Sequence, residues 1–75
     1  MIAYETAMTG AEMKKLRERL GWSQQRLATE LGMSVSQISL YERGTIRKTG
    51  HPVAIPKVVE LALEALEARR ARGEI

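Results

Sequence analysis

Residues 23–44, SQQRLATELGMSVSQISLYERG, decide how this chain folds. Ser23 and Ser34 are each placed to cap the N-terminus of a helix, because a serine hydroxyl can accept a hydrogen bond from a first-turn backbone amide. Gly32 and Gly44 stand where those helices should end, since glycine adopts the left-handed conformation of a helix terminus at low cost. The pattern predicts two short helices in immediate succession.

The connection between these helices, Gly32-Met33-Ser34, is too short to let them lie antiparallel. A turn this tight, with a glycine that can adopt positive φ, makes the helices cross steeply. Ala28 falls at the crossing, where a larger side chain would overpack the contact at a cost of ~1–3 kcal/mol. Residues 24–43 are therefore predicted to form a helix-turn-helix, with its second helix over 34–43.

A capping box opens another helix upstream. Thr9 and Glu12 are spaced so that each side chain can bond the backbone amide of the other residue. Apolar residues then recur on one helical face and a glycine ends the run: Met13, Leu16, Leu20 and Gly21. Residues 1–8 show no helical period, and we expect an N-terminal arm there, with a short edge strand as the alternative.

Pro56 marks the start of a last helix, since proline fits a first helical turn. We expect this helix over about 56–70, after a loop at 45–55, and a tail at 73–75. Its apolar residues span about 220° of the helical wheel, more than one surface helix needs for its own core. We therefore expect part of it to bind a second copy of the chain. The predicted interface row is Val59, Leu63 and Leu66, and the alternative row is Val58, Leu61 and Ala65.

The length of 75 residues allows one small domain, which we place at 9–72. Cysteine and phenylalanine are absent, so the core must come from Leu, Ile, Val, Met and Ala, which favours helices. We predict an all-α fold, a compact bundle of four or five short helices with the helix-turn-helix at its centre.

Charge is unevenly distributed along the chain. The whole sequence carries 12 basic and 9 acidic residues. Residues 11–50 hold eight basic and four acidic side chains, whereas residues 51–75 hold four of each. The positive excess thus lies in the middle, where a polyanion would gain most by binding. Apolar runs are only a few residues long, which excludes a transmembrane span or a signal peptide and predicts a cytoplasmic protein.

The sequence offers little for catalysis or metal binding. Aspartate and cysteine are absent, and His51 is the single histidine. A nucleophile–base pair or a metal cluster needs several such groups. The row Glu60, Glu64 and Glu67 is typical of a solvated helix face. We therefore predict that the chain is no enzyme and has no cofactor, metal, membrane or small-molecule ligand.

The runs Leu20-Gly21-Trp22-Ser23-Gln24 and Tyr41-Glu42-Arg43-Gly44, with Ala28 and Gly32 between them, resemble the Xre and phage Cro/repressor-type helix-turn-helix family. The similarity covers residues 9–44 well and the last helix more loosely. It implies a lambda-repressor-like fold and a partner of double-stranded DNA. It also implies a homodimeric transcription regulator, of which a repressor is the expected form.

In the resembled family the second helix of the motif enters the major groove, and the positions that match Val35, Ser36 and Leu40 reach base edges. Family members often carry Gln or Arg there, whereas Val35 and Leu40 can contact only thymine methyl groups. Hydrogen bonds to bases would then come from Ser36, Ser39 and Gln37, and specificity would depend on thymine positions and DNA shape. Alternatively, Leu40 packs on the last helix.

Phosphate contacts are expected from a second set of side chains. By resemblance, Gln24 donates to a backbone phosphate at a helix N-terminus, where free amides favour anions. Further contacts are expected from the side chains at and after the end of the recognition helix: Arg43, Thr45, Arg47 and Lys48. The cations of the first helix, Lys14, Lys15 and Arg19, are expected to be ordinary solvated residues, with phosphate contact as the alternative.

The resemblance also implies a structural ion pair between Arg17 and Glu42, semi-buried between the first and third helices. Three roles remain open for such a domain. It can act as a DNA-binding regulator, or it can be an antitoxin or accessory repressor whose main partner is another protein, a toxin or a co-regulator. It can also be a helix-turn-helix that contacts only protein, which the partly apolar outer face allows and the neighbouring basic residues oppose.

Overall fold

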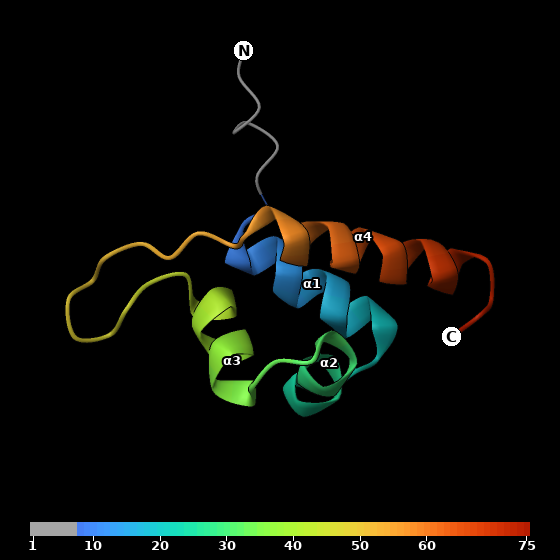
Figure 1. The fold of residues 1–75 in the computed structure, drawn as a ribbon, viewed down its shortest axis with the longest axis horizontal. Coiled ribbons are helices and arrows are strands. Elements are labelled where there is room, and N and C mark those ends of the chain that lie inside the picture. Colours follow the sequence, from blue (N-terminus) through green and yellow to red (C-terminus); the bar gives the residue numbers. More distant parts are fainter. Residues whose placement is uncertain (1–7) are drawn as a thin grey trace, which may run out of the picture.

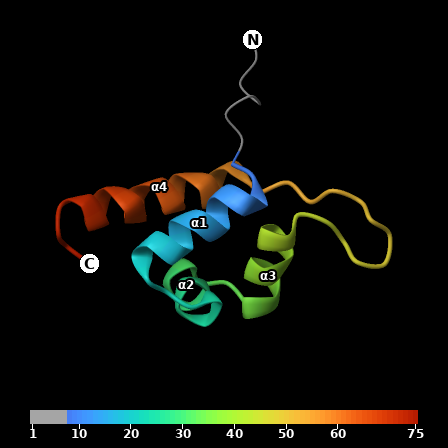
Figure 2. The same cartoon turned by 180° about the vertical axis from the view of Figure 1, so that it is seen from behind.

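The computed structural model describes residues 8–75, so the predicted arm, apart from Met8, lies outside the described residues. This part of the chain forms four helices, α1 (Gly10–Leu20), α2 (Gln24–Leu31), α3 (Val35–Arg43) and α4 (Lys57–Ala71). Helices α1 and α4 lie side by side, and α2 and α3 lie across one side of this pair (Figures 1 and 2). The all-α, lambda-repressor-like architecture is thereby confirmed.

The helix caps follow the predicted side chains. The Thr9 hydroxyl accepts from the Glu12 amide at 3.1 Å, and Glu12 accepts from the Thr9 amide at 2.8 Å. Ser23 and Ser34 accept from first-turn amides at 3.0 and 3.1 Å. Gly32 has a φ of 71°, the left-handed conformation that ends α2 and starts the tight turn. Local chemistry therefore fixes where the helices of the motif begin and end.

The core lies where α1 packs on α3 and on α4 and where α2 packs on α3. Its four largest fully buried side chains come one from each helix: Met13, Leu27, Ile38 and Leu63. Burial of an aliphatic side chain of this size stabilises the fold by about 1.5–3 kcal/mol. Ala28 is 2% exposed and forms part of the same cluster, as its place in the α2–α3 crossing requires.

A close backbone approach joins the start of α1 to the end of α3. A Cβ atom at Gly10 would lie 2.3 Å from the carbonyl oxygen of Tyr41 and 2.7 Å from that of Glu42. Real Cβ atoms essentially never come that near to a carbonyl oxygen. Gly10 therefore lets α1 rest directly on the C-terminal turn of α3, beside the polar network described below.

Residues 44–53 form a small hairpin rather than the plain loop that the sequence predicts. Thr45 and Pro52 form an antiparallel bridge. The amide of Val53 donates to the Gly44 carbonyl at 2.9 Å, and the amide of Ile46 donates to the carbonyl of residue 51 at 2.9 Å. The hairpin extends away from the helices at the end of the molecule where α3 stops (Figure 1). It carries Arg47 and Lys48 in a defined position.

The prediction for the dimer row on α4 is wrong. Val59, Leu63 and Leu66 are 8%, 0% and 8% exposed, because they pack against α1 and the rest of this chain's own core. The alternative row faces solvent, with Val58 71% and Leu61 52% exposed. Its third member, Ala65, is exposed as well. Among the described residues no helix is both long and apolar enough to cross a membrane.

Candidate nucleic-acid interface

Helix α3 has one face in the core and one face open. Ile38 and Tyr41 point inward, at 0% and 7% exposed. On the other side Val35 is 41% exposed, and Ser36 is exposed. Gln37, Ser39 and Leu40 are half-buried, and Arg43 at the end of the helix is exposed. The five predicted base-reading residues are thus all at least partly accessible.

The alternative interpretation, in which Leu40 packs on the last helix, gains no support from the helix contacts. Helix α3 packs mainly on α1 and α2. Leu40 is half-buried, yet it belongs neither to the core cluster nor to the side chains packed against it within residues 8–75. An apolar side chain on the open face of α3 remains available for a thymine methyl group.

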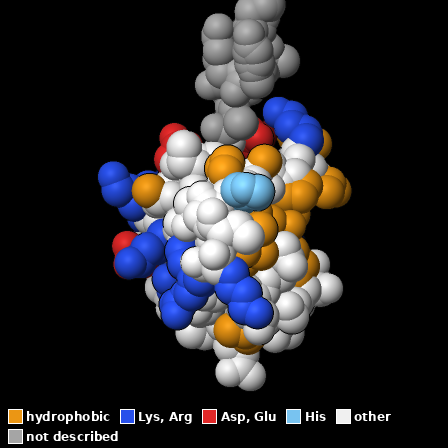
Figure 3. All heavy atoms as spheres, turned by 90° about the vertical axis from the view of Figure 1, so that its left-hand side faces the viewer, with side chains coloured by type: hydrophobic (Ala, Val, Ile, Leu, Met, Phe, Trp, Pro, Cys, Tyr) orange, Lys and Arg blue, Asp and Glu red, His pale blue; other side chains and the backbone are white. Residues whose placement is uncertain are grey.

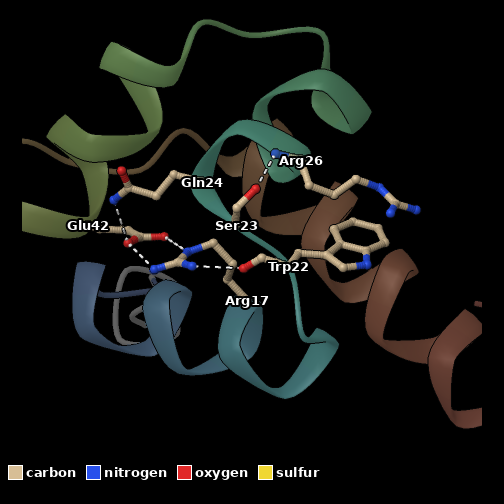
Figure 4. A network of polar contacts seen from close by, with 6 residues as sticks. All are labelled: Arg17, Trp22, Ser23, Gln24, Arg26 and Glu42. Carbon is tan, nitrogen blue, oxygen red and sulfur yellow. Dashed lines mark hydrogen bonds and ion pairs between the residues drawn. The ribbon is translucent and has the colours of Figure 1, made fainter.

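A polar network fixes α3 against α1 and α2 (Figure 4). The Arg17 guanidinium donates from Nε to Glu42 Oε2 at 2.7 Å and from Nη2 to Oε1 at 3.1 Å. Its Nη1 donates to the Trp22 carbonyl at 2.8 Å. The two side chains of the pair are 13% and 4% exposed. The ion pair implied by the resemblance is therefore present, and it ties three segments of the chain together.

The hydrogen bond to Glu42 is the main cause that raises the pKa of Arg17 above its ordinary value, against the opposing effect of burial. A raised pKa in the folded state means that the stability from this arginine is fully present below its unfolded-state pKa. That stability is lost only as pH rises through the higher folded-state value. The arginine thus stays charged through the whole ordinary pH range.

Gln24 belongs to the same network, which the sequence did not reveal. Its side-chain Nε2 donates to Glu42 Oε1 at 3.1 Å (Figure 4). This bond holds the first residue of α2 over the end of α3 and leaves the second amide hydrogen and the Oε1 atom of Gln24 uncommitted. The expected phosphate contact of Gln24 remains a prediction, now from a residue that its neighbours hold in place.

Arg26 is occupied by contacts within the protein. Its guanidinium carbon lies 4.5 Å from the centre of the Trp22 ring, a cation–π contact. Its Nε lies 3.3 Å from Glu30 Oε2, one turn further along α2. Figure 4 shows the side chain extended over the indole, away from the Arg17 network. Through these contacts Arg26 stabilises α2.

A recess of about 360 Å³ opens where α1, the N-terminus of α2, the C-terminal half of α3 and the hairpin meet. It is lined by four basic side chains, one acidic side chain and two neutral polar ones: Lys14, Arg17, Arg43, Arg47, Glu42, Gln24 and Ser39. Figure 3 views the end of the molecule with α3 and the hairpin, and shows basic side chains gathered on one side and apolar ones on the other. This end of the protein is positively charged.

Only some of the predicted phosphate-contacting residues line the recess. Arg43 and Arg47 line the recess together with Gln24. Thr45 and Lys48 are exposed on the hairpin outside that lining. The Arg43 side chain donates from Nε to the Thr45 carbonyl at 2.9 Å, which fixes the hairpin to the end of α3. Lys14, which the sequence placed among solvated residues, also lines the recess.

Helices α2 and α3, joined by the tight turn at Gly32, form a helix-turn-helix whose second helix has an open face beside a basic recess. A helix-turn-helix family model matches residues 13–51, more than half of the chain. The chain belongs to this family, the Cro/C1-type, Xre-like helix-turn-helix proteins, which bind DNA and are not enzymes. Searches of curated proteins and of solved structures give no significant match.

Proposed function

We propose that this protein is a sequence-specific transcription regulator, acting as a repressor, that inserts α3 into the major groove. The observation that carries the proposal is the position of α3, whose inner side is buried and whose outer side is open beside a basic recess. A helix fits the major groove of B-DNA, and its outward side chains can then reach base edges. Such a role goes with a cytoplasmic, nucleoid-associated location.

Base recognition in this proposal combines polar and apolar contacts. Ser36 and Ser39, with Gln37 beside them, supply hydrogen bonds to base edges, while Val35 and Leu40 contact thymine methyl groups. Serine bonds a base through a single hydroxyl, without the bidentate geometry that makes arginine or glutamine contacts strong. Discrimination therefore draws on several weak contacts and on the shape of the DNA.

Phosphate contacts position the protein without reading sequence. The proposed set is Gln24, Arg43, Thr45, Arg47 and Lys48, which lie at the start of α2, at the end of α3 and on the hairpin. Each cation that neutralises a phosphate releases condensed counterions, so it steepens the salt dependence by about one unit of log K per log salt. A steep dependence is therefore expected for the whole protein.

The proposed regulator is a homodimer that pairs through α4. The exposed row Val58, Leu61 and Ala65 repeats at the three- and four-residue steps of a coiled-coil seam. Glu64 and Arg69 flank this seam on opposite sides. Parallel pairing would set each Glu64 beside Arg69 of the partner subunit, whereas antiparallel pairing would bring the two Glu64 side chains together. The charges thus favour a parallel pair, with both hairpins at the same end.

Selection of bound sequences from a pool of random duplex DNA tests the proposal. The expected result is an enriched, palindromic site whose half-sites lie about one helical turn apart, ~34 Å, because two recognition helices then enter successive major grooves. A protein that enriches no sequence is not a sequence-specific regulator. An enriched single half-site without symmetry would contradict the homodimer while keeping base recognition.

A further inference from the structure

The positive charges that line the basic recess are not all neutralised by ion pairs within its lining. Its lining contains one acidic group, Glu42, and both carboxylate oxygens of that group already accept hydrogen bonds from Arg17. The pair cancels, which leaves the charges of Lys14, Arg43 and Arg47 around one hollow. Three converging cations with polar neighbours raise the local concentration of an anion.

Two further features suit the recess to a phosphate group. The N-terminal residue of α2, Gln24, is in its lining, so the uncommitted first-turn amides and the positive end of the helix dipole lie close by. Ser39 lines the recess from α3 and also belongs to the partly accessible face of that helix. An anion held there would therefore lie immediately beside a duplex that α3 occupies.

Lys14 and Lys15 are neighbours on α1, but they differ in whether they line the recess. Both are exposed, and both carry the same charge. Adjacent helical residues point about 100° apart, and of the two only Lys14 lines the recess. We propose that the recess binds one backbone phosphate of the DNA on which α3 is seated, and that Lys14 is a phosphate-binding residue. This inference rests on the proposed function.

The two lysines provide a matched pair of variants. Binding of a fluorescent duplex is followed by anisotropy over a series of salt concentrations for the wild type, Lys14→Ala and Lys15→Ala. Loss of one phosphate contact lowers the slope of log K against log salt by about 0.9. We expect that change for Lys14→Ala, with an equal fold-loss of affinity on selected and on random duplexes. Lys15→Ala should keep the wild-type slope, and Lys14→Arg should restore it.

The outcomes separate the two proposals. Wild-type protein that binds no duplex at any salt concentration would overturn the proposed function and this inference with it. Wild-type binding with the same slope in Lys14→Ala and Lys15→Ala would overturn only the phosphate site. A loss in Lys14→Ala confined to the selected sequence would also overturn it, because a phosphate contact carries no sequence information. Thermal unfolding by circular dichroism verifies that the variants are folded.

Discussion

Replacing Glu42 with alanine is expected to remove much of the stability of this domain. The Glu42 side chain is 4% exposed and accepts two hydrogen bonds from Arg17 and one from Gln24. In Glu42→Ala all three bonds are lost, and the Arg17 guanidinium, 13% exposed, keeps its charge without a counter-charge. Its remaining partner is the Trp22 carbonyl. The variant thus leaves a largely buried cation uncompensated.

Removing one partner of a buried ion pair costs ~3–5 kcal/mol. Arg17 keeps its bond to the Trp22 carbonyl and is slightly exposed, so the expected loss of unfolding free energy lies at the lower end of this range, about 3 kcal/mol. Domains have stabilities of roughly 0.05–0.15 kcal/mol per residue, which gives about 4–11 kcal/mol for a chain of this length. Since 1 kcal/mol shifts Tm by ~4–8 °C in a domain of this size, Glu42→Ala should melt ~12–24 °C lower.

Far-UV circular dichroism and Trp22 fluorescence can follow unfolding by heat and by urea. The matched control is Arg19→Ala, which removes an α1–α4 ion pair with Glu67 whose side chains are 54% and 45% exposed. Exposed pairs contribute ~0–1 kcal/mol, so this variant should stay close to the wild type. If Glu42→Ala lost no more stability than Arg19→Ala, the Arg17–Glu42 pair would not hold the domain together.

Four further substitutions test the packing and the surface. Gly10→Ala should destabilise the fold by ~1–3 kcal/mol in urea titrations, because the added Cβ clashes with the Tyr41 carbonyl although alanine favours helices. Unchanged stability would contradict the close backbone approach. Leu63→Ala should cost ~2–5 kcal/mol of unfolding free energy, whereas Leu61→Ala should leave the protomer intact and weaken self-association in sedimentation. The reverse pattern would mean that the two faces of α4 are exchanged. Lys48→Ala should weaken anisotropy-measured binding to all duplexes alike, and a loss on one sequence only would exclude a phosphate contact.

The parts of the fold that the sequence predicts are those set by neighbouring residues. The Thr9–Glu12 capping box and the Ser23 cap depend on side chains that bond amides three residues away, so spacing alone reveals them. The Gly32 turn is likewise local. The Arg17–Glu42 pair joins residues far apart in the chain, and it was expected only through the family resemblance.

Features that depend on how distant segments meet could not be predicted. The apolar arc of α4 is wide enough for two rows, and only contact with α1 shows that Val59 packs inward and Val58 faces solvent. The 45–52 bridge needs backbone pairing across a turn that has no alternating apolar pattern. Lys14 joins the recess because α1 passes beside α3 and the hairpin, which no motif within α1 indicates.

In the proposed complex the open face of α3 contacts base edges. Nuclear Overhauser effects between protein methyl groups and thymine methyl groups, measured on a labelled complex with a selected duplex, detect these contacts. We expect such contacts from Val35 and Leu40, with the largest shifts of backbone resonances in α3 and the hairpin. Intermolecular contacts confined to α4, with α3 resonances unmoved, would contradict the proposed complex.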